Sequence, residues 1–174
     1  NERTPSLGSS FGGGRQRKRA KQAQACGIAV QQINAADGAE QAGVADEPGV
    51  MDYYQNEIAK HHLAHRIEFL GRVSDEALLE LYSKALAVYY APYNEDYGYV
   101  TLEAFASGKP IVTANDSGGV LEFVRHEENG LIVEPTSDAI GHAVNRFVEN
   151  NEFAALCGAR GLEMVKAKGL LDSG

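Results

Sequence analysis

The sequence contains no tryptophan, only two cysteines and two methionines, and fewer basic than acidic residues. Cys26 and Cys157 lie far apart and form no C-x-x-C pair, which excludes a disulfide framework or a zinc knuckle and indicates a reducing compartment. With 16 Lys and Arg against 24 Asp and Glu, the net charge is −8, so no nucleic-acid partner is expected. Neither an apolar run of roughly 18 residues nor a signal-peptide pattern is present, so we expect no membrane span and a cytoplasmic location.

The composition is that of a globular protein whose two parts differ. The 174 residues are 44% hydrophobic and 23% charged, which predicts one domain with its own core. Residues 12–46, however, consist mostly of Ala, Gln, Gly and Arg and sustain no strand or helix period. We therefore divide the chain into a poorly specified segment, residues 1–50, which is disordered or aberrant, and a folded domain, residues 51–174.

A basic stretch, residues 12–21, has three interpretations. It could be a phosphate loop, a nucleic-acid arm or a flexible linker. The linker is favoured, because a phosphate loop requires G-x-x-x-x-G-K-[ST] after an apolar strand and neither feature is present.

From residue 51 onward, strand and helix patterns alternate. Ser74 is a predicted N-cap, followed by Asp75 and Glu76 in the first helical turn. Thr136 or Ser137 is expected to cap a helix that runs through residue 148. The predicted helices are 51–64, 75–85, 99–107, 120–124 and 137–148, and the predicted strands are 66–70, 86–91, 110–113 and 131–133. This alternation predicts an α/β fold, a Rossmann-like parallel sheet with flanking helices.

In such sheets, ligands bind beyond the carboxyl ends of the strands. Here those ends are the loops that start at Gly71, Pro92, Asn115 and Glu134. One further turn in this region, Asn115-Asp116-Ser117, matches a glycosylation sequon, but no secretion signal accompanies it. A turn over the cleft explains it better.

Two carboxylates, Glu95 and Glu103, flank Gly98 at the predicted start of a helix. Free amides of a first helical turn bind phosphate. With a diphosphate there, Glu103 could accept hydrogen bonds from ribose hydroxyls, while Glu95 would lie on the side of an attached sugar. In a chain with 24 acidic residues this spacing is weak evidence, and the alternative is two solvated surface carboxylates. Residues 100–106 are mostly apolar, which predicts a buried Glu103 and favours the functional interpretation.

Four segments together resemble a known family: residues 69–74, 95–112, 116–124 and 129–133. Over Tyr53 to Glu163 the sequence is similar to the retaining GT-B glycosyltransferases of family 4, also called group 1. The resemblance implies the C-terminal, donor-binding half of a GT-B fold. Such a domain belongs to an enzyme that transfers a sugar from a nucleoside diphosphate to an acceptor, which the sequence leaves unknown.

The resemblance also implies roles for individual residues. Glu95 would contact the hydroxyls of the donor sugar and help to orient its anomeric carbon, and Glu103 would hold the ribose hydroxyls. The other implied contacts come from backbone: Gly98, Tyr99 and Val100 at the diphosphate, and Arg72 and Val73 beside the base. Similar enzymes need no metal, and the chain has no Asp-x-Asp. We therefore expect no metal and no cofactor besides the donor.

The chain departs from the family pattern in two ways. The family opens this domain with an apolar strand that ends in Gly-Arg and is followed by lysine, and no such strand is recognisable. Arg15, Arg17 and Lys18 are assigned no catalytic role. A truncated gene, a frame-shifted reading and engineering all fit residues 12–46. The acceptor-binding N-terminal domain is also missing, so the isolated chain is expected to transfer sugar poorly or not at all.

The competing interpretation is a non-catalytic Rossmann-like module that binds a nucleotide-sugar or a partner protein. A GT-B sugar-nucleotide epimerase is a weaker third one, because it shares the architecture without the signature of residues 95–105. For three histidines near Glu57, at positions 61, 62 and 65, a solvated helix face is favoured over a metal site. Tyr97 and Tyr99 are expected to border the donor, Lys109 to face a helix C-terminus and Cys157 to lie in the core.

Overall fold

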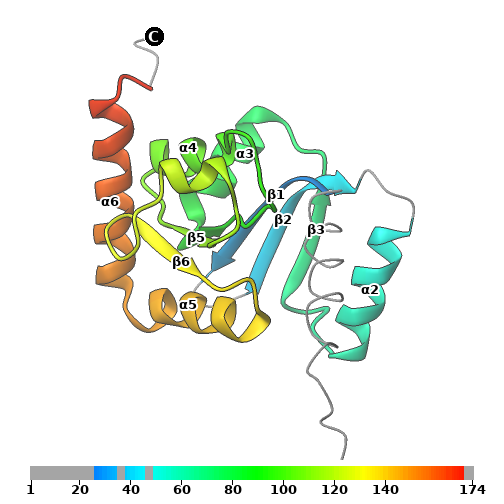
Figure 1. Ribbon diagram of the computed structural model, residues 1–174. Coiled ribbons are helices and arrows are strands. Elements are labelled where there is room, and N and C mark those ends of the chain that lie inside the picture. Colours follow the sequence, from blue (N-terminus) through cyan, green and yellow to red (C-terminus); the bar gives the residue numbers. More distant parts are fainter. Residues whose placement is uncertain (1–25, 35–37, 46–48, 171–174) are drawn as a thin grey trace, which may run out of the picture.

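The computed structural model describes residues 26–34, 38–45 and 49–170. Its elements are arranged as one sheet with helices on both faces (Figure 1). The strands are β1 (Cys26–Asn34), β2 (Gly38–Ala45), β3 (Ile67–Gly71), β4 (Ala87–Tyr89), β5 (Ile111–Ala114) and β6 (Gly130–Val133). The helices are α2 (Val50–Lys60), α3 (Asp75–Lys84), α4 (Tyr99–Ala106), the 3-10 turn η1 (Gly119–Glu122), α5 (Ser137–Glu149) and α6 (Asn151–Ala167).

The sheet has the strand order β3-β2-β1-β4-β5-β6. β4, β5 and β6 pair in parallel, and β2 pairs in parallel with β3. β1 runs antiparallel to both of its neighbours, β2 and β4. The prediction of a parallel α/β sheet with flanking helices is therefore confirmed for the region after residue 51, with one reversed strand at the centre of the sheet.

The strands β1 and β2 correct the sequence analysis, which recognised no strand between residues 12 and 46. They form an antiparallel pair in which Asn34 faces Gly38 and Cys26 faces Ala45. Backbone pairing of this kind does not require the alternation of large aliphatic side chains that marks a strand in the sequence. The basic stretch 12–21, with Arg15, Arg17 and Lys18, lies outside the described residues.

Side chains of β4 and β5 alternate between two hydrophobic cores, one on each face of the sheet. Val88 and Ile111 point into the core beneath α3 and α4, together with Phe105. Their neighbours Ala87 and Val112 point into the core beneath α5. The strand β5 is fully buried, as its apolar run predicted, whereas in the predicted run 86–91 only Ala87 and Val88 are buried and the other four residues are partly exposed. Each large apolar side chain that is fully buried here contributes about 1.5–3 kcal/mol to stability.

The helix α6 contributes to both cores and was not predicted. Val165 belongs to the core with α3 and α4, whereas Ala154 and Cys157 belong to the core with α5. Asn150 caps the helix, because its side chain accepts a hydrogen bond from the amide of Phe153 at 2.9 Å. Cys157 is a buried free thiol, as expected, and burial raises its pKa.

The two predicted helix caps are confirmed. The Ser74 hydroxyl accepts from the amide of Ala77 at 3.2 Å, and the Thr136 hydroxyl accepts from the amide of Ala139 at 3.2 Å. These bonds satisfy amides that have no partner within the helix. Among the described residues, no helix is long and apolar enough to cross a membrane.

Candidate functional site

The N-terminus of α4 is set by Gly98, which has a left-handed backbone with φ 76°. Gly98 is buried against Val120, and a Cβ at this position would lie 2.7 Å from Val120 Cγ2. The amide of Thr101 bonds to the carbonyl of Gly98 at 3.0 Å. In the part of the chain that the structure describes, the amides of Tyr99 and Val100 have no hydrogen-bond acceptor. The first turn of α4 therefore presents free donors, without an acidic side chain in that turn.

The loop that carries Glu95 is joined to the loop after β5 by backbone contacts. The amide of Gly119 donates to the carbonyl of Glu95 at 2.7 Å, and the amide of Asn94 donates to the carbonyl of Asp116 at 2.9 Å. A Cβ at Gly118 would lie 2.5 Å from the Glu95 carbonyl oxygen, so glycine is needed for this approach. Two of the predicted ligand loops thus lie side by side, and Glu95 is fixed at their junction.

Each candidate carboxylate accepts a hydrogen bond from a tyrosine. Tyr90 donates to Oε2 of Glu95 at 3.3 Å, and Tyr82 donates to Oε2 of Glu103 at 2.9 Å. The amide of Asp96 also donates to Oε1 of Glu95, at 3.2 Å. Burial, followed by the charge of the bonded carboxylate, raises the pKa of both tyrosines well above its ordinary value. Both phenols therefore remain protonated donors at neutral pH.

The prediction that Glu103 is buried is wrong, because its side chain is exposed. The short helix α4 turns one face, with Thr101, Ala104 and Phe105, into the core and places Glu103 on the other side. The cost of burying a charge therefore gives no argument about the role of Glu103. The bond to Tyr82, which is only 1% exposed, links this exposed carboxylate to the core.

Arg72 and Val73 follow β3, which is separated from β4 by the two strands β2 and β1 in the sheet order. Arg72 is exposed, whereas Val73 packs against the core that contains Val100 and Tyr82. Because β3 and β4 run in the same direction, these residues lie at the same edge of the sheet as Glu95.

Tyr97 and Tyr99 form an exposed aromatic pair beside Glu95 and Gly98, with ring centroids 4.8 Å apart. Lys109 bonds through Nζ to the carbonyl of Ser83 at 3.0 Å, so it faces the last turn of α3. Lys109 was expected to face a helix C-terminus, and the helix that it faces is α3 and not α4, the helix that precedes it in the sequence. Burial lowers the pKa of Lys109.

The histidines near Glu57 are exposed to solvent, but they do not share the helix face that was favoured for them. His61 is exposed and lies 3.7 Å from the Glu57 carboxylate, measured from Nε2 to Oε2. The helix α2 ends at Lys60, so His62 and His65 do not continue its face. No group of three potential metal ligands is found within the described ranges.

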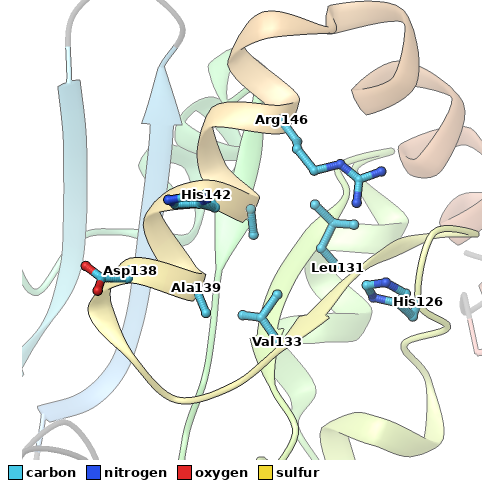
Figure 2. A pocket seen from close by; sticks show the side chains of 8 residues that line it. His126, Leu131, Val133, Asp138, Ala139, His142 and Arg146 are labelled. Atoms are coloured by element: carbon cyan, nitrogen blue, oxygen red, sulfur yellow. The ribbon is translucent and has the colours of Figure 1, made fainter.

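A groove of about 320 Å³ lies elsewhere, between the edge strand β6 and the helix α5 (Figure 2). Its floor is apolar, and His126, His142 and Arg146 stand around it. None of the predicted site residues lines this groove. It is therefore separate from the site at the N-terminus of α4.

Comparison with known proteins identifies the family. A family model, glycosyl transferases group 1, matches residues 29–164, so the chain belongs to this family of glycosyltransferases. The match begins before Tyr53 and includes most of β1 and all of β2.

Relatives and solved structures agree with this assignment. The chain is 32% identical over 111 residues to the alpha-1,3/1,6-mannosyltransferase ALG2 of Homo sapiens, covering 64% of this chain and 26% of that protein. HepE of Anabaena, solved in complex with UDP, superposes with a TM-score of 0.69 at 25% identity, over 75% of this chain and 36% of that one. The C-terminal domain of the group 1 protein LpcC from Francisella tularensis superposes with a TM-score of 0.59 at 21% identity, over 71% of this chain and 65% of that one. The fold is that of the C-terminal domain of a GT-B glycosyltransferase. The chain spans about a quarter of the length of the curated relatives.

Proposed function

We propose that this chain is the donor-binding part of a glycosyltransferase and that it binds a nucleoside-diphosphate sugar at the N-terminus of α4. The observation that carries the proposal is the pair of free amides at Tyr99 and Val100, between the carboxylates of Glu95 and Glu103. The complexes of Anabaena HepE with UDP and with UDP-glucose support a donor of this class.

The diphosphate would bind to the backbone of Gly98, Tyr99 and Val100. The amides of the first turn and the positive end of the helix dipole stabilise negative charge there. Stabilising the departing diphosphate at this point would supply a large share of the catalysis.

The nucleoside and the sugar would lie on different sides of the diphosphate. Glu103, one turn into α4, would accept hydrogen bonds from the ribose hydroxyls. Glu95, on the preceding loop, would contact the hydroxyls of the sugar and help to orient its anomeric carbon. The backbone at Arg72 and Val73 would border the base.

The proposed reaction retains the configuration of the sugar. The bond from the anomeric carbon to the diphosphate oxygen breaks, the acceptor oxygen bonds to that carbon on the same face, and the acceptor proton passes to the departing phosphate. No metal or additional cofactor is proposed. The acceptor would be held by an N-terminal domain, so we expect little or no transfer by these 174 residues alone.

Calorimetric titration of the 174-residue chain with UDP, GDP and ADP tests the proposal. Saturable binding of one nucleotide is expected. Glu103→Ala should weaken it by about tenfold or more, since hydrogen bonds to a charged group contribute about 1.5–3 kcal/mol. Glu163→Ala, on the exposed surface of α6, is the matched control and should bind like the wild type. Failure to bind any of the three nucleotides would instead favour a non-catalytic interaction module.

A further inference from the structure

Within the described residues, Glu103 is held at one of its two carboxylate oxygens. Its side chain leaves the exposed side of α4, yet Oε2 accepts from the Tyr82 hydroxyl at 2.9 Å. No partner of Oε1 is found among residues 49–170. The carboxylate is therefore anchored on one side and available for hydrogen bonding on the other.

The contact between Tyr82 and Glu103 joins two different helices, α3 and α4. Tyr82 lies near the end of α3, 21 residues before Glu103, and its ring belongs to the core with Val88, Val100 and Phe105. A phenylalanine would fill the same space in this core. The hydroxyl thus adds a polar contact that the packing itself does not require.

An unanchored glutamate on an exposed helix face samples several rotamers and loses this freedom when it binds a ligand. Anchoring one oxygen in advance reduces that loss and fixes the direction in which the other oxygen accepts. The Tyr82 phenol is protonated at neutral pH even with the ordinary pKa of tyrosine, and burial, followed by the charge of Glu103, raises that pKa further, so the donor persists.

We propose that Tyr82 is a positioning residue, which holds Glu103 through Oε2 so that Oε1 accepts hydrogen bonds from the ribose of the donor. This inference rests on the proposed function, because it assumes that Glu103 meets the ribose. Tyr90 provides an internal comparison, since its hydroxyl bonds to Glu95 at 3.3 Å instead.

The test compares the affinity for UDP with that for its 2′,3′-dideoxy analogue, measured by calorimetry on the 174-residue chain. The corresponding guanosine or adenosine pair replaces these probes where the wild type prefers that base. Tyr82→Phe should weaken UDP binding by about tenfold and leave binding of the dideoxy analogue unchanged, so that the preference for ribose is lost. Tyr90→Phe should keep the wild-type preference for ribose.

A merely structural role for Tyr82 would lower both affinities by the same factor, and that result would overturn the inference. The inference would also be overturned if Glu103→Ala abolished the preference for ribose and Tyr82→Phe left it intact. The proposed function would stand in that case. A wild-type chain without any preference for ribose overturns both. The double variant Tyr82→Phe/Glu103→Ala should bind UDP like Glu103→Ala alone, because Tyr82 acts through Glu103.

Discussion

Gly98 and Val120 are packed so closely that a methyl group on Gly98 would lie 2.7 Å from Val120 Cγ2. Gly98 also has φ 76°, which disfavours any other residue. We expect Gly98→Ala to lower the free energy of unfolding by about 2–4 kcal/mol, from the left-handed backbone and the overpacking together. Urea denaturation followed by circular dichroism measures this change.

Gly108→Ala is the matched control for Gly98→Ala. Gly108 has a similar φ of 68°, but a Cβ there would meet no atom within 4 Å. The free energy of unfolding that Gly108→Ala loses should therefore come from the left-handed backbone alone. Equal destabilisation by the two substitutions would contradict the role assigned to the contact with Val120.

The hydroxyl of Tyr90 is expected to affect the sugar end of the donor. It donates to Glu95 at 3.3 Å from a half-buried position. Tyr90→Phe should reduce the affinity for UDP-glucose relative to UDP by about threefold, which corresponds to a weak hydrogen bond. Calorimetry with both ligands gives the ratio, and an unchanged ratio would argue against a supporting role for this hydroxyl.

The Ser74 cap is a stability prediction that does not depend on function. Ser74→Ala removes the acceptor for the amide of Ala77 and should lower the free energy of unfolding by about 1 kcal/mol. Ser83→Ala is a suitable comparison, because Ser83 lies at the other end of α3 and its hydroxyl donates to the carbonyl of Glu80 within that helix. A Ser74→Ala variant as stable as the Ser83→Ala variant would refute the cap.

Two exposed carboxyl groups of α3 predict how stability depends on pH. Hydrogen bonding to its own backbone amide and to Ser74 lowers the pKa of Glu76, and Lys84 lowers the pKa of Glu80. A carboxyl whose pKa is lower in the folded state stabilises the protein above its unfolded pKa and loses this effect as the pH falls. Acidification below pH 4.5 should therefore destabilise the chain, and Glu76→Gln/Glu80→Gln should flatten that part of the pH profile measured by urea denaturation.

The sequence predicted the parts of the fold that local chemistry determines. Ser74 and Thr136 cap the helices expected of them, and the apolar run of β5 is buried. The strands β1 and β2 lacked such a pattern and were missed. The helix α6 was missed although Asn150, its cap, is a common N-cap residue. It is a helix with only a weak amphipathic pattern, because Gly158 and Gly161 lie on its buried side.

The candidate site was predictable only in part. The positions of Glu95, Gly98 and Glu103 at one helix start followed from their spacing. The exposure of Glu103 did not, since a mostly apolar segment can still place one residue on the exposed face of a short helix. Tyr82 could not be found from sequence, because its contact joins residues on two different helices.

The junction between the loops after β4 and β5 has a consequence for how specificity evolves. Asn94 and Glu95 are bonded through their backbones to Asp116 and Gly119, so the position of one turn determines that of the other. A substitution in the second turn would shift Glu95 without any contact to a sugar. On the proposed function, variants with altered sugar preference are therefore expected around Gly118 as well as among the residues proposed to contact the donor.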